Sequence, residues 1–529
     1  MKTATACTSC RISKRKCWQP RRGKSCSQCQ RNELDCSLGP SPTPPPPPPS
    51  HATGERIPAD PTQAEFVSGE VAEALVEAYI QYIHDRPHSI FHVPTLRADV
   101  RHKQLHPSTY YALLSYGARL SSDKAIFAMA EPLFERARRH LHVDIEIVCL
   151  DNIQACILLA HLAAASLRFS LEVLYLNIGI RMAQMLHLNM PQSEPVVVQE
   201  VKRRIWWTLF MADQWCSAGN GLPNQMKGLD HAVDLPMDEA VFHQPAHLLL
   251  QSSEQQRPKP GLWAHMITLA EIFGPIQDLN RQIAKHTASV SSSAIDAATE
   301  KRVMCLYQAL NKWQDDLPPD VRYSLANLCS HRDRGLGGTF VALHQGLNHY
   351  GTLLLYQYLD PSRVTNAATA ELAQRCKQYA NDQSALIRVA RDLGQCETLH
   401  PGVGHNAAIS SSVLLHTLLF GSDGELAEAR MGLQSNLETL ENLSRYWPSL
   451  ELTVRRLTVF QEACLQSTTP QPYRFDSWLV KFLLEYHLPL DEKAYETVNH
   501  IRIHEVNAVL QERSDVGAKI LQGFWGGKA

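Results

Sequence analysis

The stretch CTSCRISKRKCWQPRRGKSCSQCQRNELDC, residues 7–36, decides the fold of the N-terminal part of this chain. Its cysteines follow the spacing C-x2-C-x6-C-x8-C-x2-C-x6-C, so the second half repeats the first. A C-x2-C pair places two thiolates on one metal ion, and a cysteine six residues later can return to that ion. A zinc ion in a structural site takes four ligands, whereas each half offers three. Six sulfurs therefore saturate two zinc ions only if two of the sulfurs bridge both metals.

A disulfide framework is the alternative for six closely spaced cysteines. It requires an oxidising compartment, which secreted proteins reach by means of a signal peptide. The N-terminal residues 1–6, MKTATA, lack the apolar segment of such a peptide. We therefore expect reduced thiols and favour a metal site over disulfides.

The cysteine pattern resembles the fungal zinc binuclear cluster (Zn₂Cys₆) of transcription regulators, a module that places a helix in the DNA major groove. The resemblance covers residues 7–36. It implies that the first zinc ion takes Cys7, Cys10, Cys17 and Cys26. The second would take Cys26, Cys29, Cys36 and Cys7. Cys7 and Cys26 are then the bridging ligands, and the cofactor is two Zn²⁺ per chain.

Basic residues surround these cysteines. Residues 1–36 contain nine lysines and arginines against two acidic residues, whereas the whole chain has 51 basic and 53 acidic residues. A basic N-terminal segment on an otherwise acidic chain is typical of a module that binds DNA phosphates. The resemblance implies DNA contacts by Arg11, Lys14, Arg15, Lys16 and Arg31.

Within that set, Lys14 has the position expected to donate to guanine O6 and N7, while Arg11 and Lys16 are expected to hold phosphates. The half-site that the family prefers is a CGG triplet. Ser13 departs from the family pattern, which usually has Lys or Arg there, and this puts the reading of the triplet in doubt. The basic clusters can also serve as a nuclear-import signal.

A proline-rich linker follows the cysteines. Eight of the ten residues at positions 40–49 are proline, which forbids a helix and favours an extended polyproline spacer of about 30 Å. No heptad pattern follows Cys36, so a monomer, or a homodimer formed through the distal part of the chain, is favoured over a zipper dimer. We predict a DNA-binding domain at residues 1–39, a linker at 40–61 and a regulatory domain at 62–529.

The long C-terminal part is predicted to be helical, giving a mostly α fold with a large all-α domain. Residues 62–65 have the Thr-x-x-Glu form of a capping box. Helical patterns run through residues 108–120, 131–142 and 153–188. No apolar run approaches the length of a membrane span, so no membrane partner is expected.

Three stretches of this part resemble the regulatory domain of fungal transcription factors: residues 79–96, 175–183 and 202–213. The resemblance is best over residues 79–240. In the third stretch Trp207, Phe210 and Met211 repeat at helical spacing and should be buried. Asp213 is a candidate to pair with a nearby arginine.

Two histidines, His84 and His92, raise the question of a second metal site. Neither has a carboxylate or cysteine at a recognised ligand spacing, so a structural role is favoured over metal binding. No set of residues is predicted to be catalytic. The thiolate-rich cluster is a closed structural site, whereas catalytic zinc keeps an open position, and we therefore expect no enzyme.

Taken together, the sequence predicts a nuclear, zinc-dependent, sequence-specific regulator of transcription that binds double-stranded DNA. The resemblance further implies RNA polymerase II, the transcription machinery as a partner, and control of metabolic or secondary-metabolite genes. The alternative is a helical ligand-binding or protein-interaction regulator that uses the zinc module as a docking platform. A homodimer and a small-molecule effector stay open from the sequence.

Overall fold

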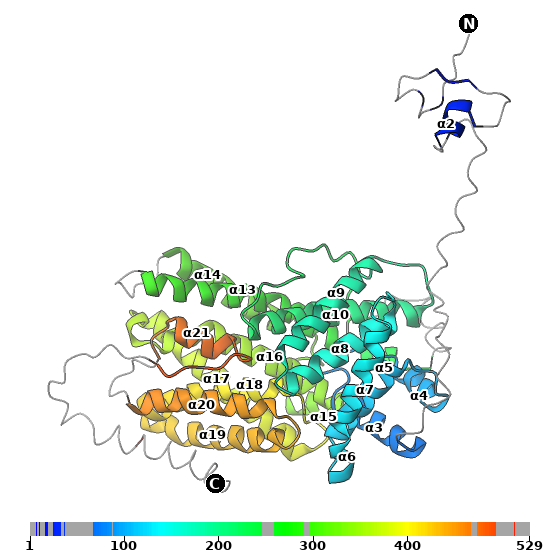
Figure 1. Ribbon diagram of the computed structural model, residues 1–529. Helices are drawn as coiled ribbons and strands as arrows, with labels where there is room; N and C mark the ends of the chain where they lie inside the picture. The colour runs from blue at the N-terminus through cyan, green and yellow to red at the C-terminus, as the bar shows by residue number, and fades with distance from the viewer. Residues whose placement is uncertain are drawn as a thin grey trace. The chain divides into compact units, whose positions relative to one another are not determined.

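The chain divides into two compact units, residues 1–58 and 59–529, in the computed structural model. The structure describes residues 7, 10, 16–18, 25–32, 36, 67–86, 88–245, 259–289, 297–466, 473–493 and 513. Helices and turns make up these residues, and no β-strand occurs among them (Figure 1). The predicted mostly α fold is therefore confirmed. The proline-rich linker and the capping box at residues 62–65 lie outside the described residues.

The first unit contains one described helix, α2 (Ser27–Arg31). Cys26 is its N-cap, and the Cys26 side chain accepts a hydrogen bond from the backbone N–H of Cys29. The helix thus begins at a cysteine of the second C-x2-C pair.

The second unit opens with helices of moderate length that belong to its N-terminal half. They are α3 (Gly69–Tyr82), α4 (Val93–Arg101), α5 (Pro107–Arg119), α6 (Lys124–Ala128), α7 (Ala130–Val143), α8 (Leu150–Ala165), α9 (Phe169–Met185), α10 (Val196–Gly219) and α11 (Glu239–Phe242).

The C-terminal half contains mostly longer helices. They are α13 (Leu262–Ser289), α14 (Ala297–Asp316), α15 (Leu325–Asp333), α16 (Gly337–Leu355), the 3-10 turns η1 (Tyr356–Leu359) and η2 (Pro361–Arg363), α17 (Ala367–Leu393), α18 (Gly402–Phe420), α19 (Asp423–Ser444), α20 (Ser449–Gln466) and α21 (Ser477–Leu484).

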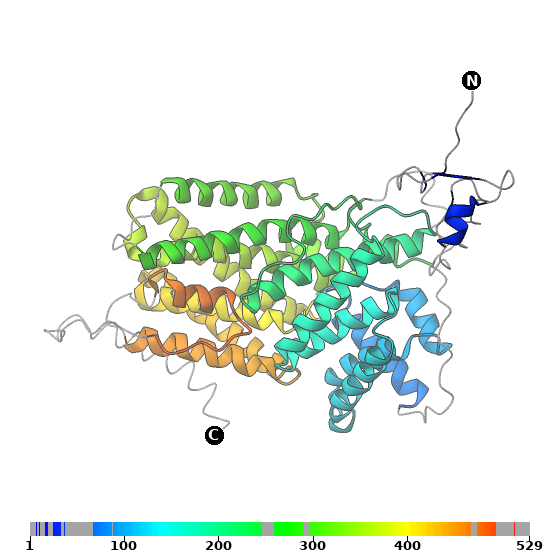
Figure 2. The ribbon, with the colours of Figure 1, turned by 45° about the horizontal axis from the view of Figure 1, so that its top comes forward.

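These helices form a layered bundle. Figures 1 and 2 show the later helices running alongside one another, with the blue and cyan helices of the N-terminal half gathered at one end. Helix α13 packs on α10 and α16, and α16 to α20 follow one another through neighbouring contacts. One continuous apolar core joins both halves and includes the buried side chains of Trp206, Trp263 and Trp447.

The apolar stretch at residues 153–188, predicted as helical throughout, is divided into α8 and α9. Leu167 lies at the break with a φ of 62°, in the left-handed region where leucine is rare. No glycine or proline marks this turn in the sequence, so only the tertiary packing of the two helices against each other reveals it. The predicted helices at 108–120 and 131–142 correspond to α5 and α7.

Burial on α10 follows the helical pattern. Trp207, Phe210 and Met211 are all buried, as the sequence predicts. In the described part of the chain, no helix combines the length and apolar character needed to cross a membrane.

Candidate functional site

The six N-terminal cysteines come together in two overlapping groups of four. One group contains Cys7, Cys10, Cys17 and Cys26, and the other contains Cys7, Cys26, Cys29 and Cys36. Within each group the sulfur atoms lie within 4.8 Å of one another. Cys7 and Cys26 belong to both groups, which is the arrangement expected of two metal ions that share two bridging thiolates.

The sulfur separations fit zinc coordination. Cys7 Sγ lies 3.8 Å from Cys26 Sγ and 3.5 Å from Cys29 Sγ, and Cys10 Sγ lies 3.6 Å from Cys26 Sγ. A tetrahedral zinc with Zn–S bonds of about 2.3 Å sets its sulfurs about 3.8 Å apart, whereas a disulfide brings them to about 2.05 Å. All fourteen cysteines are free thiols. The residues therefore fit a binuclear zinc cluster and not a disulfide framework.

The backbone repeats the same N–H to sulfur contacts in both halves of the module. The N–H of Cys10 donates to Cys7 Sγ at 3.4 Å, and that of Cys29 donates to Cys26 Sγ at 3.4 Å. Through these bonds the pKa of the Cys7 thiol is lowered and that of the Cys26 thiol falls to about 6. Metals bind the thiolate, and these N–H groups favour the thiolate form of the two cysteines that both groups share.

A second pair of contacts completes this repeat. The N–H of Cys7 donates to Cys17 Sγ at 3.4 Å, and the N–H of Cys26 donates to Cys36 Sγ at 3.2 Å. Each half thus folds its third cysteine back onto its first. The repeated spacing in the sequence has become a repeated hydrogen-bond pattern in space.

Cysteines alone make up the buried cluster among the described residues of the first unit. Cys7, Cys10, Cys26 and Cys29 are almost fully buried, with Cys17 and Cys36 packed against them. So small a module cannot be stable by apolar burial alone, and a metal commonly supplies the missing free energy.

Two of the predicted DNA-contacting residues lie on the surface of this module. Lys16 and Arg31 are both exposed, and Arg31 lies in the last turn of α2. Arg11, Lys14 and Arg15 lie outside the described residues. Their contacts with DNA stay predictions.

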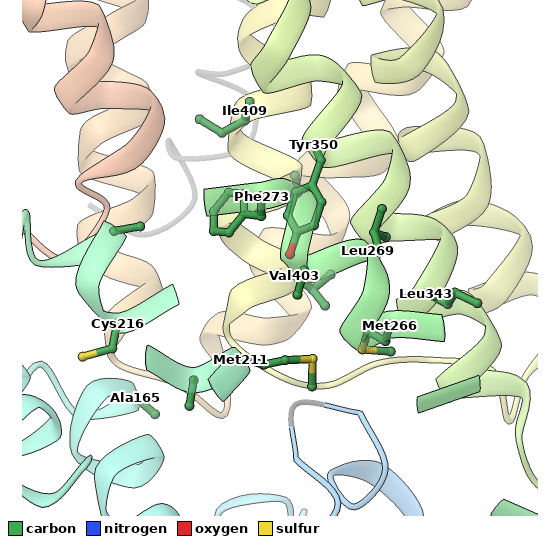
Figure 3. Close-up of a cluster of buried hydrophobic side chains, with 14 of the residues drawn as sticks. Ala165, Met211, Cys216, Met266, Leu269, Phe273, Leu343, Tyr350, Val403 and Ile409 are labelled. Carbon is green, nitrogen blue, oxygen red and sulfur yellow. The ribbon is translucent and has the colours of Figure 1, made fainter. Parts of the chain in front are cut away.

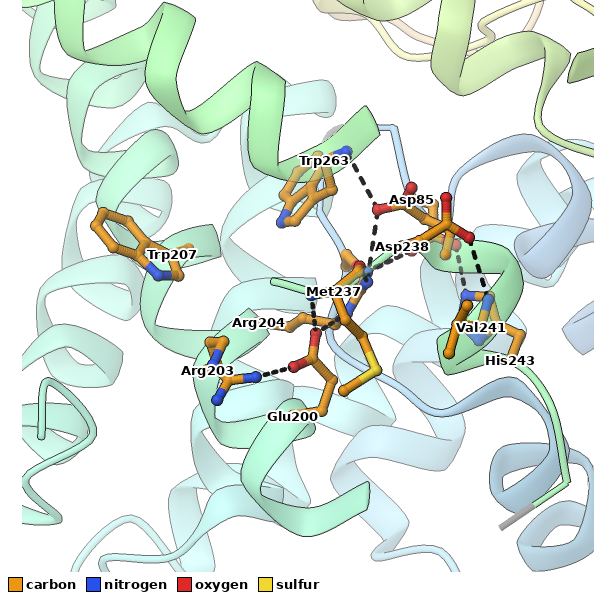
Figure 4. Close-up of polar contacts among 12 residues, drawn as sticks. Asp85, Glu200, Arg203, Arg204, Trp207, Met237, Asp238, Val241, His243 and Trp263 are labelled. Atoms are coloured by element: carbon orange, nitrogen blue, oxygen red, sulfur yellow. Dashed lines mark hydrogen bonds and ion pairs between the residues drawn. The ribbon is translucent and has the colours of Figure 1, made fainter. Parts of the chain in front are cut away.

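The second unit contains a buried polar cluster that the sequence did not predict. Its centre is Arg204 on α10, whose side chain is fully buried. Arg204 Nε donates to Glu200 Oε1 at 2.9 Å, Nη1 donates to Ser89 Oγ at 2.6 Å, and Nη2 donates to the carbonyl oxygen of Met237 at 2.6 Å (Figure 4). We call this network the Arg204 cluster.

Carboxylates connect the Arg204 cluster to neighbouring helices. Glu239 accepts the backbone N–H of Leu262 at 2.8 Å and that of Trp263 at 3.1 Å, and thereby binds the start of α13. Burial raises the pKa of Glu239, and the Arg204 guanidinium, 3.5 Å away, opposes that shift. Glu200 also accepts the N–H of Met237 at 2.9 Å. The cluster therefore fixes α10, α11 and α13 to one another.

Asp85 belongs to the same cluster and contacts two histidines, His84 and His243. His84 Nε2 accepts the N–H of Phe91 at 3.2 Å, so its Nδ1 carries the proton and lies 3.2 Å from Asp85. His243 Nδ1 accepts the N–H of Val93 at 3.4 Å, and its Nε2 donates to Asp85 at 2.7 Å. Both nitrogens of each ring are engaged, which favours a hydrogen-bonded role over metal binding.

His92, the other histidine considered as a metal ligand, is also engaged through both nitrogens. Nδ1 lies 2.7 Å from Thr95 Oγ1, and Nε2 lies 2.9 Å from the carbonyl oxygen of Gln244. His92 is therefore held between α4 and the segment after α11.

Asp213 forms no ion pair with any arginine that the structure describes, so that prediction is wrong. It accepts the Ser217 hydroxyl at 3.0 Å and the backbone N–H of Met226 at 2.7 Å. Burial raises its pKa. Asp213 thus holds the chain that follows α10 back onto that helix.

Two family models match the chain, one in each unit. The fungal Zn(2)-Cys(6) binuclear cluster domain matches residues 5–44, and the fungal specific transcription factor domain matches residues 76–315. The first match covers all six cysteines, and the second covers the Arg204 cluster.

Curated relatives resemble the chain over most of its length. The uncharacterized transcriptional regulatory protein C530.11c of Schizosaccharomyces pombe is 23% identical over 478 residues, which cover 79% of this chain and 56% of that protein. The Zn(2)-C6 fungal-type transcription factor FTF1c of Fusarium oxysporum f. sp. lycopersici is 21% identical over 416 residues, 72% of this chain and 44% of that protein. The chain thus spans about half the length of these relatives. No solved structure matches it significantly.

Proposed function

We propose that this chain, which carries a fungal Zn(2)-Cys(6) binuclear cluster domain and a fungal specific transcription factor domain, is a sequence-specific regulator of transcription by RNA polymerase II. The observation that carries the proposal is the pair of four-cysteine groups that share Cys7 and Cys26. Two zinc ions held there would organise the basic N-terminal unit for DNA binding.

In this proposal the zinc ions have a structural role. Four thiolates around each ion leave no open coordination position for a substrate or a reactive water molecule. The family matches likewise favour a regulator over an enzyme. The bound ions would fix the positions of the backbone segments between the cysteines.

Basic residues would then contact the DNA. Lys14 is proposed to donate to guanine in a CGG-like triplet, while Arg11, Lys16 and Arg31 bind phosphates and Arg15 adds positive charge. The exposure of Lys16 and Arg31 supports this assignment, since a residue that binds phosphate must be accessible.

Action on RNA polymerase II genes places the protein in the nucleus, where the transcription machinery is its partner. The relatives named as transcription factors and transcriptional regulatory proteins support this part of the proposal. Metabolic or secondary-metabolite genes are the proposed targets, by the family resemblance.

The experiment that tests the proposal is selection of binding sites from randomised duplex DNA by the zinc-loaded full chain. A CGG-like triplet should be enriched. Lys14→Ala should lose the preference for guanine by about 1–3 kcal/mol. Lys16→Ala is the matched control and should weaken binding to all sequences alike, with a smaller dependence on salt concentration.

Enrichment of no motif would contradict sequence-specific binding. It would favour the alternative, in which the zinc module is a docking platform for another protein. Enrichment that Lys14→Ala leaves unchanged would keep the regulator but contradict the assignment of Lys14.

A further inference from the structure

A cavity of about 180 Å³ lies inside the helical unit. Three helices each present one stripe of side chains to it, at helical spacing. The stripes are Ala212, Trp215 and Cys216 on α10, Met266, Leu269 and Phe273 on α13, and Ala342, Gln345, Gly346, His349 and Tyr350 on α16. Helices α8, α9, α18 and α20, Arg86 after α3, the segment before α18 and the segment after α21 complete the wall.

Aromatic side chains form a rigid part of this wall. Phe273 and Tyr350 stack with ring centroids 4.4 Å apart and an interplanar angle of 13°, and both are seen with Leu269 and Val403 in Figure 3. Trp215 Nε1 donates to the Tyr350 hydroxyl at 3.0 Å, and the Tyr486 hydroxyl donates to the carbonyl oxygen of Trp215 at 2.8 Å. Hydrogen bonds thus fix the rings around the cavity, which favours a planar apolar group as the occupant.

Two polar side chains of α16 reach the cavity without a partner. Gln345 is 4% exposed and His349 is 6% exposed, and both line the cavity one helical turn apart. Neither makes a hydrogen bond to any residue that the structure describes. Burial lowers the pKa of His349 to about 3, so its imidazole is neutral and can either donate or accept. Buried polar groups normally have partners, and these two are available to a ligand.

Arg86 adds a positive charge to the same wall. Its side chain is 7% exposed, Nη1 donates to the carbonyl oxygen of Gln81, and Nε is buried with no hydrogen-bond partner. No carboxylate within the described part of the chain lies within ion-pair distance of the guanidinium. Burial lowers the pKa of Arg86 to about 10, so the group still carries its charge at neutral pH.

The acidic residue in the wall does not balance this charge. Glu172 lies 2.9 Å from His487 Nδ1 and accepts a hydrogen bond from Asn220 Nδ2 at 3.2 Å. Glu172 is therefore already satisfied, whereas Arg86 is not. Asp85 and Glu397 favour the charged form of Arg86 from beyond ion-pair distance, and so offset part of the cost of burying the guanidinium; an anionic ligand in contact with it would offset more.

The volume suits a small ligand. An engineered apolar cavity of about 150 Å³ holds benzene. A cavity slightly larger than that, with one cationic group, suits one ring and a carboxylate.

We propose that this cavity binds a single-ring aromatic carboxylate, with the carboxylate on Arg86, the ring beside Phe273 and Tyr350, and Gln345 and His349 as further hydrogen-bonding partners. A role for this ligand as an effector of transcription rests on the function proposed above. Binding itself does not, because it can be measured without DNA.

The experiment is calorimetric titration of the zinc-loaded full chain with phenylacetate, and with phenylacetamide as the neutral analogue. Benzoate and 3-phenylpropionate test the length of the ligand. We expect saturable binding of at least one of these acids at one site per chain. Phenylacetamide should bind at least about tenfold more weakly, because hydrogen bonds to a charged group contribute about 1.5–3 kcal/mol.

Variants locate the site. Arg86→Gln should abolish the preference for the acid over the amide. Arg101→Gln is the matched control, since Arg101 is exposed on α4, and it should leave the preference unchanged. Ala342→Trp should fill the cavity and prevent binding of acid and amide alike, while Gln345→Met, a milder change, should weaken binding severalfold. Thermal unfolding confirms that each variant is folded.

Three results would overturn the proposal: no binding of any of the three acids, equal binding of acid and amide, or an unchanged preference in folded Arg86→Gln. Failure of the proposed function would be visible separately, as absence of an enriched DNA motif from a chain that still binds the acid.

Discussion

Different interactions stabilise each of the two units of this chain. Among the described residues of the first unit, cysteines alone form the buried cluster, and its order depends on thiolates gathered around metal ions. The second unit buries an extensive apolar core and places one polar cluster, centred on Arg204, among its helices. Loss of metal should therefore affect one unit, and loss of packing or of a buried charge should affect the other.

The comparison also explains where specificity resides in each unit. In the first unit, the backbone N–H groups of Cys10 and Cys29 donate to Cys7 Sγ and Cys26 Sγ, the two thiols that both cysteine groups share. In the second unit, the Arg204 side chain donates hydrogen bonds to carboxylate and carbonyl oxygens of segments far apart in the sequence. In each unit, directional hydrogen bonds favour one packing of the chain over other compact conformations.

Removal of zinc should have the largest effect. Chelation should abolish specific DNA binding and unfold the first unit, because structural zinc contributes about 10–16 kcal/mol of apparent binding free energy in small domains. The thermal unfolding midpoint of the helical unit should stay the same. DNA binding by fluorescence anisotropy and helix content by circular dichroism, with and without chelator, check this.

Cys26→Ser should reproduce the effect of the chelator, and Cys305→Ser is its matched control. Cys305 lies exposed on α14, outside the cluster. A chelated chain that keeps its DNA affinity, or one whose helical unit melts with the metal, would break the comparison.

Arg204→Met should have the next largest effect, on the helical unit. It removes the Arg204 guanidinium from the buried carboxylates of Glu200, Glu239 and Asp85, of which Glu200 keeps Arg203 as a partner, and should lower the free energy of unfolding by about 3–5 kcal/mol. Zinc content should not change. Urea unfolding measures the loss, and Arg101→Gln on the surface should change stability by less than about 1 kcal/mol. Equal stability of Arg204→Met and the unmodified chain would contradict a structural role for the cluster.

Acid should destabilise the helical unit through buried histidines. Burial lowers the pKa of five imidazoles: His161 to about 4, His344 to about 4, His349 to about 3, His400 to about 3 and His416 to about 3. The unfolded chain therefore binds more protons than the folded one below about pH 6.5, so stability falls as the pH falls from there toward 3–4. Each imidazole contributes up to about 2 kcal/mol of this loss by pH 5.

His416→Gln isolates one of these groups. The loss of unfolding free energy between pH 7 and pH 5 should become smaller by up to about 2 kcal/mol in the variant. Urea unfolding at both pH values measures the difference, and zinc content measured in parallel separates it from acid release of metal. An unchanged pH dependence would show that His416 is not protonated on unfolding.

The smallest predicted effect concerns a helix end. Asn366 caps α17 and accepts the N–H of Thr369 at 3.0 Å. Asn366→Ala should lower the free energy of unfolding by about 1 kcal/mol, without any effect on zinc content or DNA affinity. Urea unfolding checks the first result, and a loss above about 3 kcal/mol would show that Asn366 does more than cap the helix.

Local patterns in the sequence predicted much of this molecule. The spacing of six cysteines predicted two metal ions that share two sulfurs, and the family resemblance assigned the two groups and the bridging role of Cys7 and Cys26. Helical periodicity predicted the burial of Trp207, Phe210 and Met211. In both cases the residues that act together are close in sequence.

The Arg204 cluster and the cavity could not be predicted in this way. Arg204, Ser89 and Glu239 belong to segments separated by tens of residues, and nothing in any one segment indicates the others. Gln345 and His349 look like ordinary polar positions on a helix until the bundle closes over them. The partner assigned to Asp213 was wrong for the same reason, since its actual partners are set by how the chain turns after α10.

Native mass spectrometry of the full chain, with its cysteines reduced, shows directly whether the six N-terminal cysteines hold a binuclear zinc cluster. We expect a single species with two zinc ions per chain, and loss of both ions together when Cys7 or Cys26 is replaced by serine, because each bridges the two metals. A chain that holds one zinc ion or none, or one in which Cys7→Ser and Cys26→Ser keep two, would contradict it.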